Sequence, residues 1–289
     1  MVKFTDNLKK DIAALVIAGD KVKLSNYLEK LVTKFELLDY DCGRLHPASN
    51  VYNLIKFNEW LKGCTNKLPY NVFKIGNSKL PFLNFSTLPG STCPGAGACL
   101  DYCYSFKAWR YPAPFFSQCQ NTILMRENFS IIEDELKKII NTAKFNKLDK
   151  IDFRLYVDGD FANYQEIINW MLLINKLPKL AAYGYSKSLN LFLDLSDQKF
   201  KFPKNYVLNL SNGGKFDVLH KFLKDLHFVR GNFEGLNIVK GTKLSEIKKT
   251  YPNKKVFLCP GTCGDCTSIG HACGNLDTFK NYSIVLPIH

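Results

Sequence analysis

Eight of the ten cysteines fall in two compact groups that lie far apart in the sequence. The first group has the spacing C-x5-C-x3-C and is followed by a further cysteine; its members are Cys93, Cys99, Cys103 and then Cys119. The second group has the spacing C-x3-C-x2-C-x6-C, formed by Cys259, Cys263, Cys266 and Cys273. Thiolates this close together, in loops rich in glycine and proline, can bind one metal centre without straining the chain. The spacing therefore predicts two metal sites.

The ligand spacing also bears on which metal is bound. Runs of closely spaced cysteines are typical of iron-sulfur clusters, and two [4Fe-4S] clusters are the first interpretation. Structural zinc usually takes two short pairs separated by roughly a dozen residues or more. His271 could replace one thiolate of the second group and complete a zinc knuckle, so zinc stays open as the alternative. Cys42 and Cys64 stand alone and are predicted to be free thiols.

Charge and composition indicate the class of protein and its partner. The formal net charge is +13, which predicts a polyanionic partner such as nucleic acid; a lysine-rich composition without charge blocks is the competing explanation. The chain opens with no apolar secretory segment, and it has no run of about eighteen apolar residues that could span a membrane. We therefore expect a cytoplasmic protein without a membrane partner and with reduced thiols rather than disulfides.

The elements that must position the cysteines follow from hydrophobic periodicity. Residues 1–68 are predicted to form a helical accessory segment, with helices over 5–17, 23–38 and 50–61. Residues 69–245 alternate between strands and helices, which predicts an α/β core built as a partial (β/α) barrel or an open parallel sheet. The expected strands are 80–88, 151–157, 180–185, 206–210, 227–229 and 235–239, and the expected helices are 118–142, 165–176 and 216–226. Residues 246–289 form the C-terminal cysteine segment.

Polar residues follow several of the predicted strands. Parallel α/β folds bind ligands at the carboxyl ends of their strands, because the loops there share one edge of the sheet. The first cysteine loop follows the first strand, and it should therefore share a site with the other strand ends. Those ends carry the turn Asp158-Gly159-Asp160, then Ser186 and Lys187, then Asn209 and Ser211, and then Arg230 and Asn232.

A strand that runs into a loop of three cysteines, with an aromatic residue beside the last one, resembles the radical S-adenosylmethionine enzymes. Here Cys93, Cys99 and Cys103 would match that loop, with Tyr102 and Tyr104 as the aromatic neighbours. The usual spacing in that superfamily is C-x3-C-x2-C, which the first loop lacks. The second group has it, but too late in the chain for a barrel to follow, so its four cysteines are interpreted as a fully ligated auxiliary cluster.

A closer resemblance is to the phage and plasmid proteins grouped with mycobacteriophage gene product 88. The shared order of motifs begins with a cysteine loop opening in CP and closing in CY, followed by a basic aromatic stretch, over residues 93–112. A strand ending R-x-x-x-x-GDF follows at 154–161, then Y-x-YS-K-S at 183–188, and then the C-terminal cysteines. The match covers about residues 80–275 and implies a fold and a site rather than a reaction.

The first resemblance implies roles for individual residues. Cys93, Cys99 and Cys103 would hold a cluster with one open iron, and S-adenosylmethionine would bind to that iron. An electron supplied by a donor protein would cleave the cofactor to a radical that attacks the substrate. Asp158 or Asp160 would bind the amine of that cofactor; the alternative is that both simply belong to a solvated turn. Lys187 or Arg154 would bind the carboxylate of the cofactor or a substrate phosphate; the alternative is that both form surface ion pairs. The remaining predicted cofactor contacts are Tyr104, Gly159, Ser186, Asn209 and Ser211.

Two features could change this interpretation. Lys107, Trp109, Arg110 and Tyr111 combine positive charge with aromatic rings, which suits a flipped base or a single strand, or else a packed lid over the cluster. Cys119 as a fourth ligand would close the first cluster. The protein would then be a non-catalytic nucleic-acid-binding or scaffold protein with structural iron-sulfur or zinc sites.

Overall fold

The N-terminal part of the chain forms a helical layer. A computed structural model describes residues 6–39, 49–77, 79–90, 92–236, 243–252 and 255–287. The layer consists of α1 (Asp6–Ala18), α2 (Lys21–Asp39) and α3 (Asn50–Leu61), and it packs on α4 (Pro112–Glu127). Leu28, Leu54 and Phe116 are among the side chains buried between these helices.

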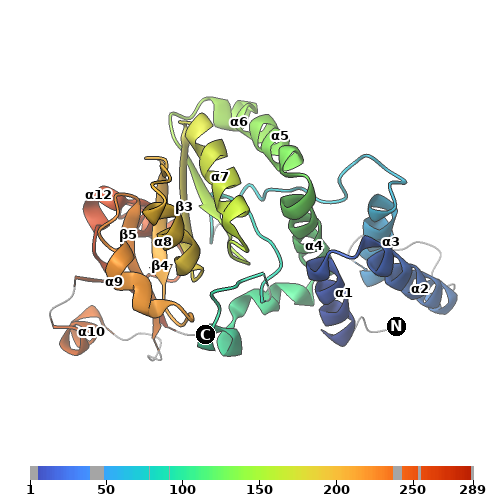
Figure 1. The fold of residues 1–289 in the computed structure, drawn as a ribbon, viewed down its shortest axis with the longest axis horizontal. Coiled ribbons are helices and arrows are strands. Elements are labelled where there is room, and N and C mark those ends of the chain that lie inside the picture. Colours follow the sequence, from blue (N-terminus) through green and yellow to red (C-terminus); the bar gives the residue numbers. More distant parts are fainter. Residues whose placement is uncertain are drawn as a thin grey trace.

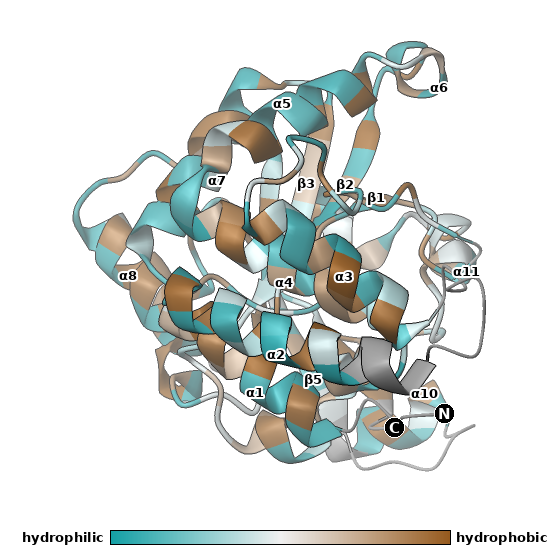
Figure 2. Cartoon of the chain, turned by 90° about the vertical axis from the view of Figure 1, so that its right-hand side faces the viewer, coloured by the Kyte–Doolittle hydropathy of each residue, from teal (hydrophilic) through white to brown (hydrophobic). Residues whose placement is uncertain are grey.

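The layer lies at one side of the molecule in Figure 1, at the blue end of the chain and next to α4. In Figure 2, α1, α2 and α3 lie in front of α4 and carry hydrophobic residues interspersed with hydrophilic ones, as amphipathic helices do. The three predicted N-terminal helices are therefore confirmed. Thr5, where the first was predicted to begin, and Cys42 lie outside the described residues.

The centre of the fold is an open, seven-stranded parallel sheet in the order β1-β2-β3-β4-β5-β7-β6. Of the two predicted arrangements, the open parallel sheet is confirmed. The strands are β1 (Leu83–Asn84), β2 (Ile151–Leu155), β3 (Leu180–Ser186), β4 (Tyr206–Ser211), β5 (Val229–Leu236), β6 (Val256–Leu258) and β7 (Ser283–Pro287). The helices after α4 are α5 (Phe129–Ile140), α6 (Ala143–Asn146), α7 (Tyr164–Lys176), α8 (Leu189–Asp197), α9 (His220–Leu223), α10 (Leu244–Thr250), α11 (Cys263–Thr267) and α12 (Leu276–Phe279). The 3-10 helices are η1 (Ala98–Tyr102), η2 (Tyr104–Arg110), η3 (Asp217–Leu219) and η4 (Ala272–Gly274).

The two faces of the sheet are covered differently. Side chains alternate between the faces along each strand, so Phe153 and Leu208 point into the main core under α5, α7 and α8, where Trp170 is fully buried. Tyr183 and Val207 point to the opposite face and pack against the C-terminal segment of α11, η4 and α12. Helices therefore cover one face, and the segment that carries the second cysteine group covers the other (Figure 1).

Several sequence predictions were wrong in detail. The helix predicted over 118–142 is interrupted at Asn128, which adopts φ −152° and ψ 68° between α4 and α5. Asparagine competes with helical hydrogen bonding through its own side chain, and here Asn128 Oδ1 accepts from the Ser130 hydroxyl at 2.6 Å. The strand predicted over 80–88 is reduced to two residues, of which Asn84 also pairs with Lys74 in an antiparallel bridge.

The carboxyl-terminal half also differs from prediction. One strand, β5, takes the place of the two predicted at 227–229 and 235–239, although residues 237–239 lie outside the described ranges. Helix α8 and strands β6 and β7 were not predicted. The helix predicted over 216–226 is shorter and divided between η3 and α9. Among the described helices, none is both long enough and apolar enough to cross a bilayer.

Candidate functional site

The first cysteine loop lies across the carboxyl ends of β3 and β4. The amide of Lys215 donates to the carbonyl of Gly95 at 2.8 Å, and the amide of Cys99 donates to the carbonyl of Gly213 at 3.1 Å. A Cβ atom on Gly95 would overlap the backbone carbonyl of Lys187, so only glycine allows this approach. The loop is therefore held where the sequence predicted a shared site.

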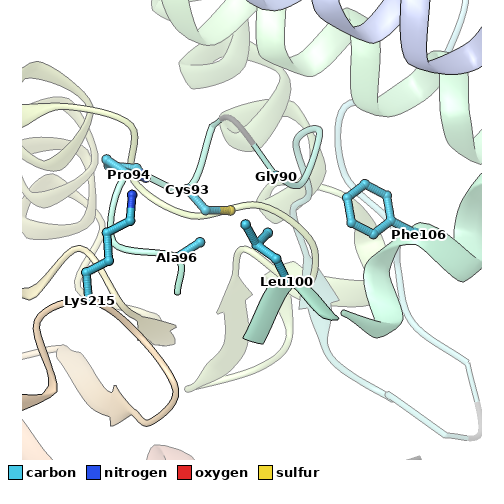
Figure 3. Close-up of a pocket in the computed structure, with 7 residues that line it drawn as sticks. All are labelled: Gly90, Cys93, Pro94, Ala96, Leu100, Phe106 and Lys215. Carbon is cyan, nitrogen blue, oxygen red and sulfur yellow. The ribbon is translucent and has the colours of Figure 1, made fainter. Parts of the chain in front are cut away.

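A pocket of about 380 Å³ opens beside Cys93 (Figure 3). The Cys93 thiol lies between Lys215 on one side and Phe106 on the other, with Leu100 below it in this view. Burial, with contributions from the nearby Asp160 and Cys103, raises the pKa of the Cys93 thiol to about 12. The free thiol is therefore protonated at neutral pH, and a bound metal, acting as a Lewis acid, would deprotonate it.

Asp160 organises the turn that follows β3. Its carboxylate accepts from the Ser186 hydroxyl, from the amide of Lys187 and from the amide of Phe161, each at 2.8 Å. Burial raises the pKa of this carboxyl, and those hydrogen bonds oppose the shift. Both oxygens are thus engaged by the protein, which gives Asp160 a positioning role beside the predicted role of binding the cofactor's amine.

Asp158 faces the other way, toward α4 and the basic aromatic stretch. Its carboxylate accepts from Gln118 at 3.0 Å, and Gln118 in turn accepts from the Trp109 indole at 3.0 Å. Burial raises the pKa of Asp158, whereas its hydrogen bonds and the positive charge of Arg154 act to lower it. Gly159 between the two acids has φ +84°, and a Cβ there would meet the Thr87 hydroxyl. The structure thus separates the two acids that the sequence placed in one turn.

Lys187 and Ser211 come together at the same edge. The Lys187 ammonium donates to the Ser211 hydroxyl, which joins the carboxyl ends of β3 and β4. Tyr104 reaches the end of β2, where its hydroxyl donates to the carbonyl of Val157 and accepts from Arg154 at 3.4 Å. These residues, predicted as cofactor contacts, therefore line the carboxyl edge near the first loop.

The second cysteine group lies against the sheet face opposite the main helices. Burial raises the pKa of Cys259, and the neighbouring thiols Cys266 and Cys263 contribute to that rise; Cys259 acts in the same way on Cys273. The four cysteines of this group are thus electrostatic neighbours. Burial raises the pKa of the Cys273 thiol to about 12, although a hydrogen bond donated by Tyr185 acts to lower it.

Two arginines stand beside these thiols. Arg230 is fully buried; it donates to Asn209 Oδ1 at 2.5 Å, to the carbonyl of Tyr282 at 2.6 Å and to the carbonyl of Asn232 at 2.7 Å. Asn209 also donates to the carbonyl of Cys273 at 3.1 Å. Burial lowers the pKa of Arg230, and the Cys273 thiol opposes that shift. Asn209, predicted as a cofactor contact, is therefore committed to holding the second cysteine segment.

Arg154 lies between the two cysteine groups. Its guanidinium is 4.8 Å from the centre of the Tyr185 ring, and its charge lowers the pKa of Cys259 and Cys273 against the effect of burial. Burial acts to lower the pKa of Arg154, because it disfavours the charged guanidinium. The effects of Tyr104, Tyr185, Tyr183 and Cys263 outweigh burial and raise that pKa above the ordinary range. Tyr185 was missed as a site residue by sequence reasoning, although it lies on a predicted strand just before Ser186. Arg230 was expected among the polar residues at a strand end, and the structure instead buries it within β5, beside Cys273.

Cys119 and His271, whose roles were left open, can now be located. Cys119 is fully buried on α4 among the apolar side chains that join it to the N-terminal helices, and burial alone raises its pKa well above normal. His271 stacks on Phe82 with ring centres 4.3 Å apart, and its Nδ1 is 3.8 Å from Asp152 Oδ1. No described contact directs the side chain of Cys119 or of His271 into a cysteine group.

The donor set fits a metal centre better at the second group than at the first. In the described part of the chain, no three cysteine, histidine, aspartate or glutamate side chains converge at metal-ligand distances. The second group nevertheless offers four neighbouring thiols beside two buried or half-buried arginines, and a thiolate-bound cluster carries negative charge that such cations offset. In the first loop, Cys93 and Cys103 are electrostatic neighbours.

Comparison with known proteins gives one family. The family model described as gene product 88 matches residues 53–233, which is more than half of the chain. The matched region includes the first cysteine loop and β1 to β4, and it ends before the second cysteine group, which the predicted resemblance had included. No curated protein and no solved structure gives a significant match.

Proposed function

The chain belongs to the gene product 88 family, and from this premise we propose that it is an iron-sulfur protein of the radical S-adenosylmethionine type. Cys93, Cys99 and Cys103 hold the reactive cluster at the carboxyl edge of the sheet. The second cysteine group holds an auxiliary cluster against the opposite face. The resemblance of the first cysteine loop to that of radical S-adenosylmethionine enzymes supports the reaction type, and the location of the loop supports the site.

The observation that carries the proposal is the location of Cys119. A reactive cluster needs one iron without a protein ligand, and a fourth cysteine in the first group would remove it. Cys119 instead lies in the apolar contact between α4 and the N-terminal helices, with Phe57 and Phe116 in the same cluster. The first loop is left with three cysteines, which is the donor set that an open iron requires.

The chain's own residues would prepare the site for its cofactor. A cluster bound there would supply the electron that cleaves S-adenosylmethionine. Asp160 holds the amide of Lys187 and the Ser186 hydroxyl in place, so the turn after β3 stays under the first loop. Phe106 and Leu100 wall the pocket and limit the access of water to Cys93 (Figure 3). Lys215, on the opposite wall, offers a positive charge to a carboxylate or phosphate.

The second group would have a different role. Four thiols, the Tyr185 hydrogen bond and the charges of Arg154 and Arg230 form a closed, electropositive environment. Such an environment stabilises a fully ligated, anionic cluster and offers it no exchangeable position. This centre would store or relay electrons, or hold the C-terminal segment on the sheet.

The test begins with anaerobic purification of the full chain, followed by assays of iron, sulfide and zinc. Electron paramagnetic resonance of the reduced protein is then recorded with and without S-adenosylmethionine. We expect two clusters, one of which changes its spectrum when the cofactor is added. Cys93→Ala should remove the responsive signal, and Cys266→Ala should remove the other.

The outcomes separate the proposal from its rivals. Iron without any response to S-adenosylmethionine would mean that both clusters are closed, and the protein would then be a structural or electron-transfer protein. Zinc without iron would overturn the iron-sulfur assignment altogether. Cys119→Ala serves as the matched control, since it removes a cysteine of the same region that the proposal leaves without a metal.

A further inference from the structure

An exposed aromatic surface surrounds the pocket of the first cysteine loop. We define the loop surface by the large apolar or aromatic residues of 100–111 that are 37% to 66% exposed: Leu100, Tyr102, Tyr104, Phe106 and Tyr111. No other stretch of this length in the described chain holds so many exposed large hydrophobic residues. Large exposed apolar groups cost free energy in water, so such a concentration usually marks a binding surface.

The loop surface rests on a rigid base. Trp109 is buried, which excludes it as a stacking platform; of the two alternatives left open for that residue, the structure shows packing rather than an exposed ring. Its ring packs edge-on against Phe106 and Phe115, with centres 5.0 and 5.1 Å apart. Its carbonyl accepts from Lys9 on α1, and its indole donates to Gln118. The exposed ring of Phe106 is therefore held against Trp109 before any ligand binds, which reduces the entropy lost on binding.

Positive charge accompanies the rings. Lys107 and Arg110 are exposed in the last turn of η2, and the exposed Lys215 lines the neighbouring pocket. One nearby acidic group, Asp101, is exposed. Three others are engaged by the protein: Asp217 accepts from the amides of Gly213 and Gly214 at 2.8 and 2.9 Å, Asp158 accepts from Gln118, and Asp160 accepts from Ser186 and the amide of Lys187. The surface is thus cationic on balance, in a chain of net charge +13.

From this combination we propose that the loop surface binds single-stranded nucleic acid. Unpaired bases can stack on Tyr111 and Phe106, while Lys107, Arg110 and Lys215 contact phosphates. The pocket of about 380 Å³ beside Phe106 is within the usual size range of small-molecule sites and would admit one nucleotide. That this nucleic acid is the substrate of the first cysteine site rests on the proposed function. The binding itself does not, because it needs no cofactor.

The test measures binding of fluorescein-labelled 20-mers of deoxythymidine and of uridine to the full-length, anaerobically purified protein. We expect Tyr111→Ala to weaken binding by about 5- to 100-fold, the range for loss of one base-stacking ring. Tyr111→Phe keeps the ring and should bind like the parent protein. Phe222→Ala is the matched control, because Phe222 is a similarly exposed ring beside a lysine, Lys221, on α9.

A second measurement tests the charges. The double variant Lys107→Ala/Arg110→Ala should reduce the slope of log K against log salt by about 1.4, as expected for two phosphate contacts on a single strand. Lys248→Ala/Lys249→Ala, which removes two exposed lysines from α10, should leave the slope unchanged.

Other outcomes would overturn the inference. These are the absence of oligonucleotide binding, an equal loss in Phe222→Ala, or stronger binding to anionic phosphatidylserine vesicles than to either oligonucleotide. Duplex carrying one mismatched base is included to distinguish a flipped base from a free strand. Metal and sulfide are assayed on the same samples, so loss of the cluster and loss of nucleic-acid binding are read separately.

Discussion

The guanidinium of Arg154 stacks on the ring of Tyr185, with its central carbon 4.8 Å from the ring centre. Arg154 comes from β2 and Tyr185 from β3, and both face the C-terminal segment. Tyr185 donates to the Cys273 thiol, while Arg154 also donates to Tyr104 beside the first cysteine loop. One cation thus links the neighbourhoods of the two cysteine groups.

Replacing Arg154 with glutamine should lower the reduction potential of the second centre. A nearby positive charge stabilises the reduced cluster, which is the more negative form, so its loss makes reduction harder. An interaction on the order of 1–2 kcal/mol at the effective dielectric of a protein corresponds to a shift of about 40–90 mV for one electron. The measurement is a redox titration followed by electron paramagnetic resonance.

The controls for this prediction separate charge from packing. Arg154→Lys keeps the charge and should retain most of the potential. Arg126→Gln removes an arginine that pairs with Glu127 on α4 and contacts the N-terminal helices, and it should leave the potential unchanged. An unchanged potential in Arg154→Gln would mean that Arg154 does not act on a cluster.

Cys119→Ala should lower stability without changing the metal content. The thiol is fully buried among apolar side chains, and its removal leaves a small cavity that costs about 1 kcal/mol of unfolding free energy. Cys103→Ala should do the opposite and lose the first centre with little effect on the N-terminal core. Denaturant unfolding and iron assays on both variants provide the comparison, and iron loss in Cys119→Ala would restore the four-cysteine interpretation.

Gly95→Ala should displace the first cysteine loop. The added methyl group would overlap the backbone of Lys187, which cannot move without disturbing the turn that Asp160 holds. We expect a cost on the order of 3 kcal/mol, or a shift of the loop that relieves it. The first centre should be lost and the second retained. Ala98→Ser, an exposed position in the same loop, should keep both centres.

The sequence was informative where chemistry and local pattern coincide. Strands ending at polar turns correctly indicated that Lys187 and Ser211 would meet at one edge with the first cysteine loop. The part played by Arg230 could not be predicted in this way, because it depends on which face of the sheet the C-terminal segment covers. Strands β6 and β7 have three and five residues, too short for an alternating pattern to distinguish them from loop.

His220 should make the stability of the fold depend on pH. Burial lowers the pKa of this imidazole, against the opposing effects of Asp217, the Asn232 hydrogen bond and Glu234. The unfolded chain therefore binds the proton more tightly than the folded one. Unfolding free energy should rise with pH up to the ordinary histidine pKa of about 6.5, and it should fall as the pH drops below that value.

The measurement is denaturant unfolding of the parent protein and of His220→Gln between pH 5 and pH 8. Glutamine can keep a hydrogen bond to Asn232, which lies 3.1 Å from His220 Nδ1, but it does not titrate. The difference in unfolding free energy between the two proteins should therefore change with pH below neutrality and become constant above it. A difference that is the same at every pH would mean that His220 has the same proton affinity in the folded and unfolded chains.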